Sequence, residues 1–194
     1  MAHFFAYISR VKLIERWSLM FSVRKENVAE HSLQVGMIAH GLALIKNKYF
    51  DGNINADRVT TLAMYHDASE VITGDLPTPV KYSNPTIKEA YKAIEENAIT
   101  NLLSFLPEDL VEDYQTILDP GAEDAEAMKL VKAADTLCAY IKCLEERALG
   151  NNEFNRAKAT LEAKIRSYRM PEVDHFMAHY MNSFSLNLDE LSSH

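Results

Sequence analysis

Four ionisable residues in this sequence fall where a buried apolar helix face is expected. These are His31, His66, Asp67 and Asp135. His31 continues an apolar pattern of three- and four-residue steps, and Asp135 lies within a long periodic segment. A buried carboxylate costs free energy unless an opposite charge compensates it. A divalent metal would compensate two imidazoles and two carboxylates together, and this donor set suits Mn, Co, Fe, Ni or Zn better than Ca or Mg.

Each of these residues also has a simpler interpretation. A single histidine on an apolar face is more often a hydrogen-bonded core residue than a ligand, and Asp135 alone could pair with Lys132. Adjacent helical residues project about 100° apart, so His66 and Asp67 can bind one ion only if facing helices supply further ligands. His31 and Asp135 are placed to be those ligands. We therefore predict one metal site formed by all four residues.

The elements that position these residues are predicted to be helices. Nearly every segment has apolar residues at three- and four-residue spacing, and almost none alternates strictly. Only 6 Gly and 6 Pro are present, which is too little turn chemistry for a many-stranded sandwich or barrel. The prediction is an all-α fold. A chain of 194 residues, 47% of them hydrophobic and with no linker or repeat, is expected to form a single domain over residues 1–194.

Capping residues and turn residues set the predicted helix limits. Asn27 and Asn84 can cap helices, and Pro85 suits a first helical position. The stretch from Thr73 to Pro79, which contains Gly and two prolines, must end a helix. The predicted helices run from Phe4 to Trp17, from Asn27 to about Lys46, from after Asn55 to Ile72, from Pro85 to about Phe105, over a short segment after Pro107, from about Glu123 to Leu149, and over two segments beyond Gly150.

The net charge limits the class of partner, and the cysteines indicate the cellular compartment. The net charge is −8 and the pI is about 5.4, so no positive field exists to hold a nucleic acid, and a small anionic substrate must be met by a metal or a few cations. The sequence contains no run of about 18 apolar residues, so it predicts no membrane span. Cys138 and Cys143 lie five residues apart on one predicted helix and point away from each other. This pattern, without a signal peptide, indicates a cytoplasmic protein.

The order of His31, His66-Asp67 and Asp135 resembles the HD-domain superfamily of metal-dependent phosphohydrolases. The flanking blocks are similar to the bacterial 5′-deoxynucleotidases of that superfamily. These blocks are Glu15-Arg16-Trp17, NVAEHSLQV from Asn27 to Val35, AMYHDASEVITGDLPTPVK from Ala63 to Lys81, LVKAADTLCAY from Leu130 to Tyr140, and NNEF from Asn151 to Phe154. The resemblance implies a homodimer that hydrolyses deoxyribonucleoside 5′-monophosphates to the deoxynucleoside and phosphate.

The resemblance also implies one divalent metal per subunit, Co, Mn, Fe, Ni, Cu or Zn, held by His31, His66, Asp67 and Asp135. Such a metal would lower the pKa of a bound water and withdraw charge from the phosphorus. By the same resemblance, His31, Asp67 and Asp135 also border the substrate, and Asp67 is counted among the catalytic residues. The sequence does not determine which metal is used or which base is preferred.

Arg16 and Trp17 match the family's phosphate and sugar contacts. The planar guanidinium of Arg16 suits two phosphate oxygens at once, although a solvated arginine at the end of the first helix is the simpler interpretation. Trp17 is the single tryptophan. By resemblance it lies against the sugar, where its ring would leave no room for a 2′-hydroxyl. Ordinary aromatic packing is the alternative.

The resemblance assigns substrate contacts to the loop Asp75-Leu76-Pro77-Thr78, for which a plain helix-ending loop is the alternative. Glu70 lies one turn beyond His66, on the ligand side. We expect Glu70 to orient the attacking water or to move a proton to or from it. His40 lies nine residues after His31, about half a turn out of phase, which favours one metal over two.

Other functions remain open at this point. Within the superfamily, the alternatives are a nucleotide triphosphohydrolase or a cyclic-dinucleotide phosphodiesterase. Outside it, the same residues could form a structural metal site in a non-catalytic helical module, and such sites are usually closed. A diiron helical oxygenase would need paired Glu-x-x-His signatures, which this sequence lacks. His175 and His179 form an i,i+4 pair for which a partly solvated face is the preferred interpretation.

Overall fold

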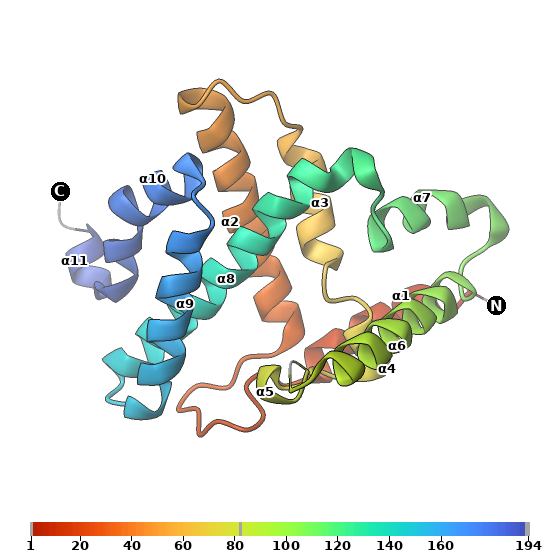
Figure 1. The fold of residues 1–194 in the computed structure, drawn as a ribbon, viewed down its shortest axis with the longest axis horizontal. Coiled ribbons are helices and arrows are strands. Elements are labelled where there is room, and N and C mark those ends of the chain that lie inside the picture. The colour runs from red at the N-terminus through yellow and green to blue at the C-terminus, as the bar shows by residue number, and fades with distance from the viewer. Residues whose placement is uncertain (1, 82, 193–194) are drawn as a thin grey trace.

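The computed structural model describes residues 2–81 and 83–192, and within these ranges it contains helices and one isolated β-bridge but no strand (Figure 1). The all-α prediction is confirmed. The α-helices are α1 (Phe4–Ile8), α2 (Val28–Tyr49), α3 (Ala56–Tyr65), α4 (Glu70–Thr73), α5 (Thr78–Lys81), α6 (Pro85–Leu103), α7 (Glu108–Leu118), α8 (Ala125–Ala148), α9 (Asn155–Ser167), α10 (Pro171–His179) and α11 (Leu188–Ser192). Short 3-10 helices cover Ser9–Leu13, Ala122–Asp124, Asn152–Phe154 and Met181–Ser185.

Helices α2, α3 and α8 cross at the centre of the molecule and share the larger apolar core (Figure 1). Leu42 of α2, Leu62 of α3 and Leu137 of α8 are fully or almost fully buried there. Helix α9 packs on α8, and α10 packs on α2. These contacts bury the apolar stripes that the sequence pattern predicts, and they bring the site-bearing parts of α2 and α8 together.

Residues of α1, α6 and α7 form a second, smaller apolar cluster. Phe4 and Leu102 are completely buried in it, and Ala68 joins it from the turn that follows α3. Tyr65 and Val71 pack against the same cluster. The turn that carries His66 and Asp67 is therefore flanked on both sides by residues anchored in apolar packing.

Asparagine side chains cap the N-terminal ends of α2, α3 and α6, among other helices. The side-chain oxygens of Asn27, Asn55 and Asn84 accept hydrogen bonds from backbone N–H groups three residues on, at 3.0, 3.0 and 2.9 Å. Each cap satisfies a backbone donor that the helix leaves unpaired. Asn27 and Asn84 act as the sequence predicts, and Pro85 occupies the first turn of α6.

The first predicted helix is wrong beyond its first turns. α1 ends at Ile8, a 3-10 helix follows to Leu13, and Arg16 and Trp17 lie outside any helix. The backbone N–H of Arg16 donates to the carbonyl of Glu26 at 2.9 Å, in the bridge between Glu15 and Asn27. Pairing with the segment before α2 replaces helical hydrogen bonds, an interaction that local periodicity cannot reveal.

The third predicted helix is interrupted. α3 ends at Tyr65, a turn covers residues 66–69, and α4 contains only Glu70–Thr73. His66, Asp67 and Glu70 therefore lie on a turn and at the start of a short helix rather than along one continuous face. Gly74, at φ 71°, then ends α4 in a conformation that favours glycine. Within residues 2–81 and 83–192, none of the helices has the length and apolar character of a membrane span.

Candidate active site

His31, His66 and Asp67 come together where the first turns of α2 meet the turn after α3. One ligand atom from each lies within 4.8 Å of the other two. The Nε2 atom of His66 is 3.2 Å from Oδ2 of Asp67, and Nε2 of His31 is 3.7 Å from the same oxygen. The predicted convergence of these three residues is present in the structure.

Asp135 lies beside this three-residue cluster. Its Oδ1 atom is 3.2 Å from Nε2 of His31, and its side chain is 35% exposed. The sequence also allowed Asp135 to pair with Lys132, but in the structure its carboxylate faces the imidazole of His31. All four predicted ligands therefore meet around His31, with Asp135 on the more open side.

The two imidazoles present free nitrogen atoms to the cluster. Nδ1 of His66 lies 2.7 Å from the carbonyl oxygen of Ala63, which can only accept, so Nδ1 carries the proton. Nε2 of His66 is buried without a hydrogen-bond partner, as are both ring nitrogens of His31. Buried polar atoms are normally hydrogen-bonded. Once deprotonated, these Nε2 atoms beside carboxylates form a donor set that fits a divalent transition metal.

The electrostatics of the cluster favour a bound cation. Burial alone would lower the pKa of His66, but the carboxylates of Asp67 and Asp135 outweigh it and raise that pKa to about 9. Burial would raise the pKa of Asp67, yet the neighbouring His66, Arg16 and His31 hold it well below its usual range. A metal that binds here must displace a proton from this cluster, so its affinity will depend on pH.

Arg16 reaches the cluster from the extended segment after the first helical turns. Its Nη1 atom donates to Oδ2 of Asp67 at 3.2 Å, and its Nε atom lies 3.8 Å from Oε2 of Glu26. The side chain is 13% exposed, so Arg16 is not the solvated arginine that the sequence left open. Burial opposes its charge, but Asp67 and Glu26 raise its pKa overall. A fixed guanidinium therefore faces the cluster.

Glu70 is buried near the same cluster. It is 9% exposed, and its Oε2 atom has no hydrogen-bond partner. Burial, together with the carboxylates of Asp67 and Asp75, raises the pKa of Glu70 to about 9. This carboxyl group therefore carries a proton at neutral pH in the metal-free protein. It could exchange that proton with a group bound at the cluster.

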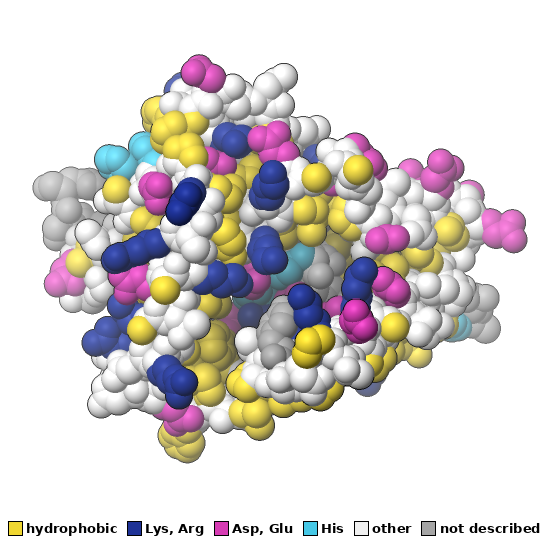
Figure 2. Space-filling model, viewed as in Figure 1, with side chains coloured by type: hydrophobic (Ala, Val, Ile, Leu, Met, Phe, Trp, Pro, Cys, Tyr) yellow, Lys and Arg dark blue, Asp and Glu magenta, His cyan; other side chains and the backbone are white. Residues whose placement is uncertain are grey.

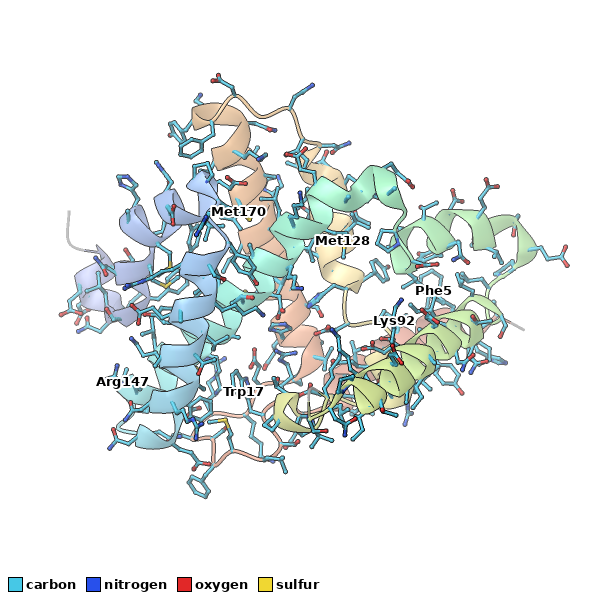
Figure 3. All side chains as sticks on the ribbon, in the orientation of Figure 1. Phe5, Trp17, Lys92, Met128, Arg147 and Met170 are labelled. Carbon is cyan, nitrogen blue, oxygen red and sulfur yellow. The ribbon has the colours of Figure 1, made fainter. Side chains whose placement is uncertain are left out.

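Trp17 lies in the loop segment that passes between the N-terminal end of α2 and α9 (Figure 3). Its backbone has φ 59°, a conformation that is an outlier for a bulky residue. The indole Nε1 donates to Oε2 of Glu26 at 2.8 Å, and the ring lies 5.3 Å from that of Phe154. Both a polar contact and an aromatic contact thus fix the side chain.

The loop Asp75-Leu76-Pro77-Thr78 is only partly joined to the cluster by the described contacts. Burial raises the pKa of Asp75, and the nearby Arg16 partly offsets that rise. Leu76 and Pro77 are half-buried, and Thr78 is exposed at the start of α5. The carbonyl of Pro77 accepts hydrogen bonds from the backbone of α5. Among the described contacts, only Asp75 of this loop interacts with cluster residues.

Glu26 is a residue that the sequence analysis missed. Its side chain is 11% exposed and lies against Arg16, Trp17 and His31. Burial would raise the pKa of Glu26, but His31 and Arg16 lower it overall. It precedes the first helical residues of α2, so it belongs to no periodic face, and its position next to the cap Asn27 is the single signal that the sequence offers.

His40, His175 and His179 lie away from the cluster. His40 borders a groove between α2 and α3 together with Met37 and Met64. The rings of His175 and His179 are 4.3 Å apart, and His175 stacks on Tyr49, but no third ligand joins them within residues 2–81 and 83–192.

In the view of Figure 2, basic side chains surround a hollow near the middle of the molecule.

The fold defines the class of protein. The chain superposes on an HD-domain phosphohydrolase from Listeria innocua with TM-score 0.83 and 25% identity, over 98% of this chain and 92% of that one. It also superposes on the cyanophage S-2L HD phosphohydrolase, described as bound to dA and one catalytic Zn²⁺ ion, with TM-score 0.65 and 19% identity over 92% and 96% of the two chains. At that lower identity the likeness shows the fold alone. The chain has the HD-domain phosphohydrolase fold, as the resemblance implies.

The family follows from the sequence comparisons. The family described as 5′-deoxynucleotidase YfbR-like matches residues 3–184. A 5′-deoxynucleotidase from Yersinia pestis and one from Yersinia pseudotuberculosis are each 58% identical over 192 residues, which cover 99% of this chain and 98% of theirs. The chain belongs to the YfbR-like 5′-deoxynucleotidase family, and the resemblance stated from its motifs is confirmed.

Proposed function

We propose that this chain hydrolyses deoxyribonucleoside 5′-monophosphates to the deoxynucleoside and phosphate. In this proposal His31, His66, Asp67 and Asp135 hold one divalent metal per subunit. The observation that carries the proposal is the cluster of three ligand atoms within 4.8 Å, whose histidine Nε2 atoms have no hydrogen-bond partner. The chain that presents this cluster is 58% identical to 5′-deoxynucleotidases over nearly its whole length.

The bound metal would lower the pKa of a water and withdraw charge from the phosphorus. Arg16 binds the phosphate in this proposal. Its Nη1 atom already lies 3.2 Å from Asp67, so its guanidinium borders the metal ligands without being one. The planar group can contact two phosphate oxygens and stabilise the charge that develops on them.

In this proposal Glu70 transfers a proton during hydrolysis. Its buried carboxyl group has a raised pKa and an unpartnered Oε2 atom, which suit an acid that donates a proton to the leaving oxygen or a base that orients the attacking water. Asp67 serves both as a ligand and as the carboxylate that fixes Arg16. These two carboxyl groups thus have separate roles, because their surroundings shift their pKa values in opposite directions.

The sugar is bounded by Trp17 and by the loop Asp75-Leu76-Pro77-Thr78. Trp17 has a fixed, partly exposed ring, which supports a steric role against a 2′-hydroxyl. Asp75 is the loop residue that interacts with Arg16 and Asp67. The carboxylates of Asp67 and Asp135 and the ring of His31 border the same space and complete the substrate contacts of the proposal.

The proposal also includes a homodimer. Leu33, Met37 and Leu44 form an apolar row on the outer side of α2, and Met64 of α3 lies close to it; each of the four is about half exposed or more. An apolar surface of this kind supports contact with a second copy. Sedimentation at micromolar concentration tests it: the expected mass is twice 22.0 kDa, and Met37→Glu should reduce it to that of one chain.

The proposal treats residues 1–194 as one domain that acts in the cytoplasm on a small nucleotide. Cys138 and Cys143 are both free and buried, which supports a reducing compartment. The net charge of −8 supports a small anionic substrate over a nucleic acid.

A phosphate-release assay tests the proposed activity. The metal-reconstituted protein is incubated with deoxy- and ribonucleoside 5′-monophosphates, 3′-monophosphates and deoxynucleoside triphosphates. Inorganic phosphate should appear from the deoxyribonucleoside 5′-monophosphates and much less from the other monophosphates. Release of pyrophosphate or triphosphate from the longer substrates would instead identify a different phosphohydrolase. The same panel, run with substrates of several bases and with several metals, determines the base preference and the metal preference.

A further inference from the structure

The carboxylate of Glu26 contacts three residues of the proposed site, two through one oxygen and one through the other. Its Oε2 atom accepts a hydrogen bond from Trp17 Nε1 at 2.8 Å and lies 3.8 Å from Arg16 Nε. Its Oε1 atom lies 3.4 Å from Nδ1 of His31. The two oxygens are therefore divided, with Oε2 on the tryptophan and arginine side and Oε1 on the histidine side.

The histidine contact determines which nitrogen of His31 can bind a metal. A carboxylate facing Nδ1 favours the tautomer with the proton on that atom, which leaves Nε2 with its lone pair. Nε2 is the nitrogen that faces Oδ1 of Asp135 at 3.2 Å and Oδ2 of Asp67 at 3.7 Å. Glu26 thus stands behind His31 in the position that carboxylates commonly occupy behind metal-binding imidazoles.

The tryptophan contact holds a strained residue. Trp17 has φ 59°, which is a strained backbone conformation for a residue other than glycine. It persists only where surrounding contacts fix it, and the described side-chain contacts of the indole are the Glu26 carboxylate and the ring of Phe154. Removing the Glu26 side chain would leave Phe154 as the described contact of the indole ring, while the Trp17 backbone keeps its hydrogen bonds with Met20 and Asp75.

Glu26 is not needed to anchor its own loop. The backbone N–H groups of Val23 and Arg24 donate to Glu146 at 2.8 and 3.0 Å, and the backbone of Glu26 itself pairs with Arg16 at 2.9 Å. These bonds do not involve the Glu26 side chain. Its carboxylate is therefore available for a task other than holding the chain in place.

We propose that Glu26 is a positioning residue that directs Nε2 of His31 toward the metal and holds Trp17 and Arg16 at the substrate side. The proposal rests on the function proposed above, because it deepens the account of the same site. It extends that account to a residue outside the ligands and substrate contacts already named.

The variants Glu26→Gln and Glu26→Ala distinguish the contact of this carboxylate with His31 from its contact with Trp17. In Glu26→Gln the amide oxygen can still accept from Trp17, while the NH₂ group then faces Nδ1 of His31 and favours the tautomer with a proton on Nε2. In Glu26→Ala both contacts are lost. Glu15→Ala is the matched control, because Glu15 lies in the same bridge but is 55% exposed and pairs with the exposed Lys25.

Metal affinity is the first readout, measured by competition of the apo-protein and a chelator for Zn²⁺. We expect both Glu26 variants to bind about 10–100-fold more weakly than the parent, the range typical of residues that orient a ligand. Glu15→Ala should match the parent. An affinity within about twofold of the parent for Glu26→Gln, in a protein that is folded by circular dichroism, would overturn the proposal.

The fluorescence of Trp17 is the second readout, and it reports on this residue alone because the chain has 1 Trp. Glu26→Ala should shift the emission to the red and increase quenching by acrylamide, whereas Glu26→Gln should stay close to the parent. Identical spectra for Glu26→Ala and the parent would overturn the tryptophan half of the proposal. If Glu26→Ala does not fold, the nearly isosteric Glu26→Gln still tests the histidine half.

Activity is the third readout. Glu26→Gln should lower kcat more than it changes KM, and Glu26→Ala should also reduce the preference for deoxy over ribo substrates. The first two readouts need no substrate, so they separate the two hypotheses. A parent protein that releases no phosphate refutes the proposed function, while unchanged metal affinity and fluorescence refute the role of Glu26.

Discussion

The carboxylates of Glu146 and Asp67 each join distant parts of the chain, but their surroundings differ. Glu146 is completely buried and accepts hydrogen bonds from the Lys142 ammonium at 2.6 Å and from the Asn151 amide at 2.8 Å. The backbone N–H groups of Val23 and Arg24 donate to it at 2.8 and 3.0 Å. Every direction around this carboxylate that the structure describes is occupied by a donor, as a structural anchor requires.

Asp67 lies among groups that are only partly satisfied. Its Oδ2 atom is 3.2 Å from both Arg16 Nη1 and His66 Nε2, yet nitrogen atoms of His31, His66 and Arg16 lack hydrogen-bond partners. Glu70 adds an unpartnered oxygen. The network around Glu146, whose donors and acceptors are paired, stabilises the fold. The network around Asp67, which contains unpaired nitrogen atoms, fits a ligand. The predictions below test this division by asking which property each change removes.

Asp67→Ala should have the largest effect, and the effect should be on activity. Phosphate release should fall at least about 1,000-fold, because the change removes a predicted ligand and the partner of Arg16. Bound metal, measured by atomic emission, should fall with it. The free energy of unfolding of the metal-free protein should change less than in Glu146→Ala. Appreciable turnover by Asp67→Ala would argue against a shared metal centre.

Glu146→Ala should affect stability instead. The change leaves the buried ammonium of Lys142 without its carboxylate, which costs about 3–5 kcal/mol. For a chain of this size the melting temperature should fall by roughly 10 °C. Thermal unfolding with and without metal measures this effect, and each folded molecule should still bind one metal. Loss of metal affinity at temperatures where the variant is folded would show that the two regions are not separate.

Glu70→Gln should reduce turnover by about 100-fold or more while leaving metal content unchanged, because the amide cannot exchange a proton. In the metal-free protein the Glu70 pKa is raised from 4.5 to about 9, so its contribution to stability is fully present below pH 4.5 and is lost as the pH rises from 4.5 to about 9. The variant should lack this loss in urea titrations across that interval. Full turnover with normal metal content would show that Glu70 has no proton-transfer role.

Acid should weaken the network around Glu146. The hydrogen bonds from Lys142 and Asn151 outweigh burial and lower the pKa of Glu146 to about 2, from an ordinary 4.5. A lowered pKa contributes stability above pH 4.5 that is lost as pH falls through 2, and the shift corresponds to about 3 kcal/mol. Glu146→Gln should lose less stability than the parent over this interval. Parallel urea titrations at pH 7, 4.5 and 3 compare them, and equal losses would refute the assignment.

Much of the fold could be predicted from local signals. The caps at Asn27, Asn55 and Asn84 begin helices where the sequence indicates, since capping depends on atoms three residues apart. The apolar periodicity of the long segments gives the all-α class, and α8 ends within a residue of its predicted limit at Leu149. The grouping of His31, His66 and Asp67 was also predicted from residue type and motif order, although the structure places His66 and Asp67 on a turn rather than on an apolar stripe.

The rest depends on contacts between segments that local patterns do not encode. The segment of Arg16 and Trp17 is not helical, because its backbone bonds to the residues before α2. Glu26 joins the site although it lies on no periodic face. The sequence by itself determined the all-α class and the long helices α2, α6 and α8, since apolar periodicity and caps depend on neighbours along the chain. Only the tertiary structure decided which carboxylates are saturated and which face unpartnered nitrogens, because that depends on where distant donors come to lie.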